Sequence, residues 1–167
     1  PMPENIENFS FYVPDTFAAG SECFPKKLQP FQHFNLTMAR ENSRVVNRRI
    51  PGKEAMQLLV KLPDMGLKLK TAADIAAQLV DERINKWKVV RRRTYQSVIG
   101  FDIFYKQLVT QKPDFATFFT NHVASSQHRY WAAVFPEDYD NLKLGREWIE
   151  TYNGEIVYTM KKADEMI

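Results

Sequence analysis

The sequence is poor in cysteine and histidine and has no long apolar runs. The shortage of cysteine and of apolar runs each excludes a class of protein. The single cysteine, Cys23, cannot form an internal disulfide, which excludes the disulfide-rich secreted scaffolds. No apolar run approaches the roughly 18–20 residues that cross a membrane, and no signal peptide is visible. The net charge of +3 is too small to favour a nucleic-acid partner. We therefore expect a cytoplasmic protein that binds neither membranes nor nucleic acids.

The short motifs of phosphate binding and hydrolysis are also missing. The chain has no glycine-rich phosphate loop, no paired-cysteine motif, no HExxH and no GxSxG. The sequence therefore contains no evident catalytic nucleophile.

The run KWKVVRRR, residues 86–93, places five basic residues in eight beside Trp87. A solvated helix face explains this run better than a nucleic-acid site, since no binding motif accompanies it.

The chain does contain apolar residues that recur with a strong helical periodicity. Its length suits one domain, and its composition is typical of a soluble globular protein. It has 167 residues, of which 44% are hydrophobic and 26% charged. Residues 71–112 should form either one long, bent helix or two helices that meet near Gly100. We prefer two, because glycine weakens a helix interior. Arg91, Arg92 and Arg93 should be exposed there. The apolar face should be buried, and it comprises Ile75, Leu79, Trp87, Tyr95 and Ile103. Further helices are expected at 31–38, 53–62 and 146–167.

One segment departs from the helical pattern. Residues 115–120 are short, apolar and aromatic, and they lie between Pro113 and the pair Ser125-Ser126. This length and composition predict a buried strand. A helix, a buried strand and a further helix make an α/β arrangement, which is mostly helical here and has few strands. Ligands of such folds gather beyond the carboxyl ends of the strands.

Two of the three histidines follow this predicted strand, in TNHVASSQHRYW at 120–131. Imidazole nitrogen is a good ligand for zinc, so His122 and His128 are candidate ligands of a divalent metal, with zinc the first choice. Asn121 is a candidate contact for the substrate. No Asp or Glu lies between 115 and 136, so carboxylate ligands would have to come from elsewhere. A structural role, in which His122 bonds within a buried turn and His128 begins the next helix, explains the pair equally well.

The segment PDFATFFTNHVASSQHRYW, residues 113–131, resembles the alkaline phosphatase superfamily in its phosphodiesterase and nucleotide pyrophosphatase-like branch. His128 matches the histidine of that branch's Asp-x-x-x-His motif, and Trp131 matches the aromatic residue that follows. The aspartate position is occupied by Ala124, which departs from the family pattern. The resemblance implies a metal-dependent phosphoester hydrolase. Residues 1–110 would be a helical insertion or cap, and residues 111–167 a strand-helix core segment.

The family's other catalytic elements are absent from the 167 residues. The resemblance places a Ser or Thr nucleophile before Pro1 and an Asp-His-Gly ligand motif after Ile167. Position 1 is not a methionine, and the apolar stripe of the last helix continues to Ile167. These features predict an internal fragment of a larger alkaline phosphatase-like fold. It would be inactive alone and completed by the rest of the parent protein or by another chain. The alternative is a helix-rich protein-binding module with structural histidines.

Overall fold

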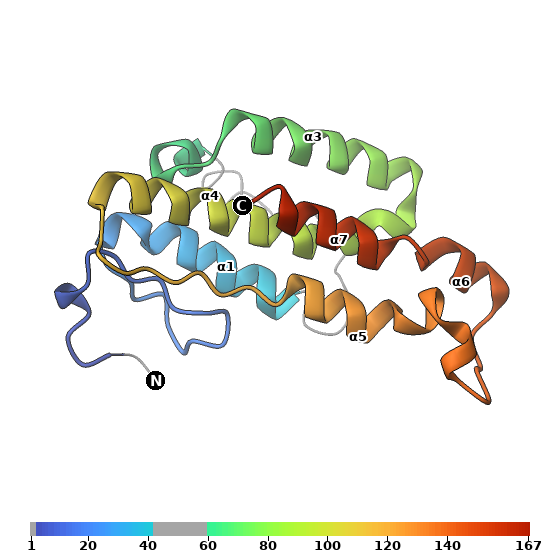
Figure 1. The fold of residues 1–167 in the computed structure, drawn as a ribbon. Coiled ribbons are helices and arrows are strands. Elements are labelled where there is room, and N and C mark those ends of the chain that lie inside the picture. Colours follow the sequence, from blue (N-terminus) through green and yellow to red (C-terminus); the bar gives the residue numbers. More distant parts are fainter. Residues whose placement is uncertain (1–2, 42–59) are drawn as a thin grey trace. The chain divides into compact units, whose positions relative to one another are not determined.

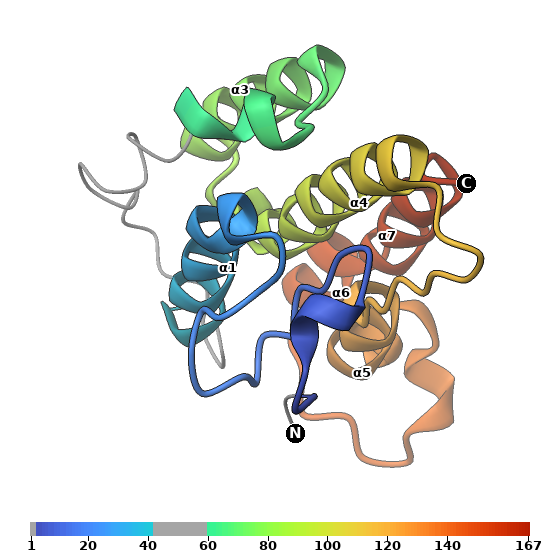
Figure 2. The same ribbon diagram turned by 90° about the vertical axis from the view of Figure 1, so that its left-hand side faces the viewer.

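The computed structural model describes residues 3–41 and 60–167, and these form helices joined by loops (Figures 1 and 2). The predicted, mostly helical character is confirmed. The described residues contain no sheet, and their β pairing is an isolated bridge between Tyr12 and Phe24. The chain divides into two compact units, residues 1–119 and 120–167, which are described separately below. Among the described residues, no helix combines the length and the apolar character that crossing a bilayer requires.

Unit 1 consists of helices from both sides of the undescribed stretch 42–59. The predicted helix at 31–38 is confirmed and is longer, whereas most of the one predicted at 53–62 lies outside the described residues. Residues 60–65 are helical. The other helices of unit 1 are η1 (Ile6–Asn8), η2 (Lys26–Leu28), α1 (Gln29–Glu41), α3 (Leu69–Ile84), η3 (Lys86–Arg91) and α4 (Arg92–Gln111).

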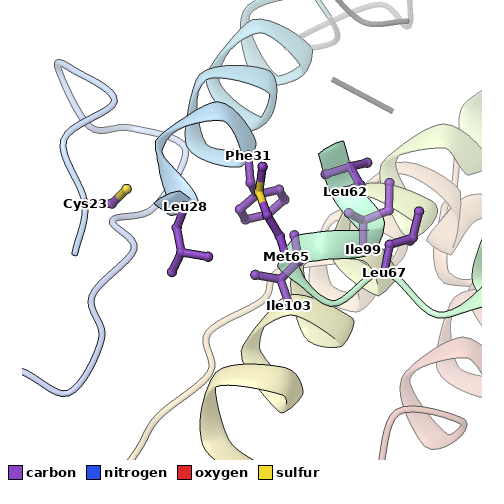
Figure 3. Packing of buried hydrophobic residues seen from close by; sticks show 8 residues of the cluster. All are labelled: Cys23, Leu28, Phe31, Leu62, Met65, Leu67, Ile99 and Ile103. Atoms are coloured by element: carbon purple, nitrogen blue, oxygen red, sulfur yellow. The ribbon is translucent and has the colours of Figure 1, made fainter. Parts of the chain in front are cut away.

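The core of unit 1 joins α1, the turn after residue 60 and α4 (Figure 3). Its buried members are Cys23, Leu28, Phe31, Leu62, Met65, Leu67, Ile99 and Ile103. Gly100 lies within α4, where a Cβ would stand 3.6 Å from the ring of Phe31 and 3.7 Å from that of Phe118. These are ordinary van der Waals distances, so both rings pack beside Gly100 while α4 continues through it. The predicted helix boundary at Gly100 is wrong.

The break between the helices falls instead at Asn85, where polar contacts hold η3 against α3. The Asn85 side chain donates to Asp81 (2.7 Å), and the Gln78 amide donates to the carbonyl of Lys88 (2.9 Å). Lys88 also pairs with Asp81, at 2.6 Å. These bonds satisfy groups at the helix end that would otherwise need water.

The predicted exposure of the three arginines is wrong. Arg91, Arg92 and Arg93 are each partly buried, and the side chain of Arg92 is only 10% exposed. Its guanidinium binds the carboxylate of Glu82, which is 6% exposed, with Nε 3.0 Å from both carboxylate oxygens. Arg91 lies over the Trp87 ring instead. The carboxylate of Glu82 and the ring of Trp87 thus allow Arg92 and Arg91 to be partly buried.

Residues 114–119, which we call the linking segment, follow α4 and form no strand (Figure 1). Exposure alternates along it: Phe115 is 83% and Phe119 77% exposed, whereas Phe118 packs against Phe101 and Phe104 with ring centroids 5.4 and 5.3 Å apart. The described part of the chain provides no backbone hydrogen bond to these residues. The predicted buried strand is therefore not formed by the described residues, which cover only one side of the segment.

Unit 2 is a small helical assembly. It contains α5 (His122–Val134), η4 (Pro136–Asp138), α6 (Arg146–Tyr152) and α7 (Glu155–Asp164). α5 packs against both α6 and α7. Tyr130 of α5 stacks on Tyr152 of α6, with centroids 5.1 Å apart. The helix predicted over 146–167 is divided at Asn153-Gly154, where glycine lowers the cost of interrupting the helix.

Candidate functional site

The predicted site residues lie at the start of α5. Asn121 immediately precedes the helix, is exposed, and makes no side-chain capping bond. His122 is the first helical residue and is only 5% exposed. Its Nδ1 lies 2.8 Å from the hydroxyl oxygen of Thr120, so a hydrogen bond holds the ring. Thr120, the residue that follows the linking segment, therefore orients the histidine.

The other ring nitrogen of His122 has an unusual environment. Nε2 is buried, and the described residues provide it with no hydrogen-bond partner of ordinary geometry, although the Thr159 backbone is close enough to influence its protonation. The neighbouring contact between α5 and α7 is polar as well. Ser126 donates to the carbonyl of Glu155 (3.3 Å), and Thr159 donates to the carbonyl of Ile156 (2.8 Å). His122 therefore lies within a buried polar interface of unit 2.

His128 lies on a different face of the same helix. Six residues advance an α-helix by about 600°, which is about 120° short of two full turns, so the two imidazoles point about 120° apart around the axis. The buried stripe of α5 comprises His122, Ser126, Tyr130 and Ala133, whereas His128 is exposed. The structure therefore does not bring the two histidines into one crevice, as the sequence had led us to expect. The helix begins at His122 rather than near His128, and this earlier start separates the rings.

The residues present do not complete a metal site. The described ranges, 3–41 and 60–167, contain no group of three or more His, Cys, Asp or Glu side chains placed to hold an ion. His122 has one ring nitrogen fixed and the other unpartnered, which is how a ligating imidazole is commonly held. Unit 2 would thus supply one ligand, and the metal roles predicted for His122 and His128 stay predictions.

Burial lowers the pKa of His122 below its ordinary value of 6.5, because a charged ring loses its hydration; the nearby Thr159 backbone partly opposes this effect. The unfolded chain regains the ordinary pKa and therefore takes up a proton first as the pH falls. The contribution of neutral His122 to stability is complete above pH 6.5 and is lost below it. The fold of unit 2 thus favours the neutral ring.

We expect α5 and α7 of unit 2 to become less stable on acidification from about pH 7.5 to 5.5, because the unfolded state binds the additional proton. Amide hydrogen exchange of the two helices, corrected for intrinsic rates, measures the effect. A His122→Gln variant should lose this pH dependence. The exposed His33 provides the matched control, since His33→Gln should keep it. Equal pH dependence in wild type and His122→Gln would contradict the assignment.

Sequence reasoning missed the buried polar residues of the α5–α7 interface in which His122 lies. Ser126, Glu155 and Thr159 are 5%, 2% and 5% exposed. A signal for Ser126 was available, since it follows His122 by four residues and would share its face if the helix began there. Glu155 carried no such signal, because an acidic residue at the start of a helix ordinarily lies in solvent.

Comparisons with protein-family models, with curated proteins and with solved structures find no match to this chain.

Proposed function

We propose that this chain is part of a metal-dependent phosphoester hydrolase of the alkaline phosphatase kind, whose nucleophile and sheet are supplied by other segments. The observation that carries the proposal is the linking segment. Its backbone groups lack hydrogen bonds from the described residues, and its side chains alternate between a packed and an exposed side. An extended segment with this pattern is suited to a place in a sheet.

The exposed rings of the segment support the same proposal. Phe115 and Phe119 are two of the most exposed large apolar side chains among the described residues. A neighbouring strand would satisfy the backbone, and a covering layer would remove both rings from water. In an α/β enzyme, such a strand between two helices has its site at the carboxyl end. That end here is Thr120, Asn121 and His122.

In such a site, this chain would contribute a histidine whose ring is held in place by a neighbouring residue. Thr120 fixes one nitrogen of His122, and the buried Nε2 is the ring nitrogen without a hydrogen-bond partner among the described residues. The polar side chain of Asn121 is exposed beside it. The described donor set is incomplete, so the remaining ligands and the nucleophile belong to other segments in this proposal. The chain alone should not hydrolyse phosphoesters.

The test uses the product of the complete reading frame that contains this sequence. Purified protein is assayed with bis(p-nitrophenyl) phosphate, and its zinc content is measured. If His122 is a ligand or orients one, His122→Ala should lower metal affinity about 10–100-fold and reduce turnover accordingly. His33→Ala is the control and should change neither value. His128→Ala decides between the two rings: a loss confined to this variant would assign the ligand to His128.

The proposal fails if the complete product has no phosphoesterase activity, or if neither histidine variant changes activity and metal content. It also fails if the reading frame contains no Ser or Thr nucleophile and no Asp-His-Gly segment. A second candidate, a helix-rich protein-binding module, would then take its place. That candidate is favoured by the burial of His122 between α5 and α7, which is what a structural histidine requires.

A further inference from the structure

Helix α3 has an apolar face that no described residue covers. We call this face the α3 stripe; its members are Leu69, Ala73, Ala76, Ala77, Val80 and Ile84. Leu69, Val80 and Ile84 are 86%, 59% and 77% exposed, and the three alanines are exposed as well. The six positions span about 100° of the helix, the width of a packing surface. In Figures 1 and 2, α3 lies at the margin of unit 1 with α4 on one side only.

The inner face of α3 explains why the stripe points outward. Thr71, Gln78 and Glu82 are buried on that side. Gln78 bonds to the backbone of η3, and Glu82 holds Arg92 of α4. The helix is thus held to unit 1 by these polar contacts and by Ala72 and Ile75, which pack against the core cluster, whereas the residues of the α3 stripe are directed to solvent. A contiguous exposed apolar face of this kind marks an interaction surface.

We propose that the α3 stripe binds the same stripe of a second copy of this chain, with the two helices antiparallel. The spacing of the stripe is symmetric about the point between Ala76 and Ala77. A two-fold axis at that point places Leu69 opposite Ile84 of the second copy, and Ala73 opposite Val80. The alanines at the centre let the backbones approach closely, while the large residues at the ends fill the space between the helices. A two-fold contact of this kind closes on itself and gives a dimer.

The charges beside the stripe fit this orientation. Lys70 and Asp81 lie on the same edge of the stripe. In an antiparallel pair this edge meets its own copy, as equivalent positions do in antiparallel coiled coils. Lys70 then lies about two residues along the axis from Asp81 of the second copy, about 3 Å. Opposite charges therefore meet twice, once on each side of the two-fold axis. There Lys70, which pairs with Asp74 of its own chain, would join the Asp81 that already binds Lys88 and Asn85.

The expected dimer is weak. A single helix of 16 residues from each copy buries less surface than a standard protein interface. The dimer should therefore dissociate on dilution. Sedimentation of the 167-residue chain from about 5 to 500 µM should show a monomer–dimer equilibrium governed by mass action. A chain that stays monomeric throughout this range overturns the proposal.

Matched variants localise the contact. Ala76→Glu places a charge at the centre of the stripe and should weaken dimerisation at least about tenfold, because its carboxylate would be buried beside its own copy. Ala124→Glu makes the same change at an exposed position of α5 and should leave dimerisation unchanged. Circular dichroism checks that both variants retain their helices. Equal effects of the two substitutions overturn the proposed interface.

Disulfide trapping tests the antiparallel orientation. Ala76→Cys should cross-link to its own copy under mild oxidation, since the two positions nearly meet at the axis. Leu69→Cys should not, because its two copies would be about 22 Å apart, but it should cross-link to Ile84→Cys in a mixed sample. Cys23 interferes little, as it is buried and burial raises the pKa of its thiol to about 11. Cross-linking of Leu69→Cys to itself, or of none of these pairs, overturns the arrangement.

Discussion

Replacement of Arg92 by methionine should lower the free energy of unfolding by about 3–5 kcal/mol. The carboxylate of Glu82 is 6% exposed, and methionine would leave it without the guanidinium that binds it. A buried charge without a partner is costly, because neither water nor protein compensates for its lost hydration. The substitution therefore reports on a contact that holds α3, η3 and α4 together.

Urea denaturation followed by circular dichroism measures this loss. Removing both charges in the double variant Glu82→Leu/Arg92→Met should restore most of the stability, since no charge is then left buried. Arg146→Met is the matched control. Its pair with Glu150 is exposed, with side chains 91% and 61% accessible, so the loss should stay within about 0.5 kcal/mol. Arg92→Met costing no more than Arg146→Met would contradict the assignment.

Replacement of Ile103 by alanine should cost about 2–5 kcal/mol, because it removes buried methyl and methylene groups and leaves a cavity. Ile103 is 2% exposed and belongs to the cluster that joins α4 to α1 and to residues 60–67. Val109→Ala is the control on the same helix, where the side chain is 51% exposed and the loss should be small. The two variants are compared by urea denaturation. Similar losses would show that Ile103 does not lie in the core.

Helical periodicity predicted most of the fold, and the errors have identifiable physical causes. The apolar repeat located α1 and α4, because buried helices must repeat their apolar positions about every turn. It misplaced the break between the two helices, since Gly100 lies in the interior of α4 with the rings of Phe31 and Phe118 packed beside it. It also misjudged Arg92, because a basic run does not reveal that a carboxylate ten residues earlier will fold onto it. Contacts between distant residues decide such cases.

The candidate site was predicted only in part. Composition indicated an extended segment at 115–120 followed by histidines. The chain does leave α4 there without forming a further helix until His122. Whether such a segment becomes a strand depends on a neighbour, which a single stretch of sequence cannot specify. The relation between His122 and His128 depended on where α5 begins, and helix boundaries are the least predictable feature of a sequence.

Amide hydrogen exchange at Phe115–Phe119 tests most directly whether the linking segment is a strand completed by other segments. It should be measured in the isolated 167-residue chain and in the product of the complete reading frame. In the isolated chain these amides should exchange at nearly intrinsic rates, since no described residue bonds to them. In the complete product we predict slowing by at least about 100-fold, as a neighbouring strand accepts their hydrogen bonds. Equally fast exchange in both proteins would contradict the proposal that this segment belongs to the sheet of a larger enzyme.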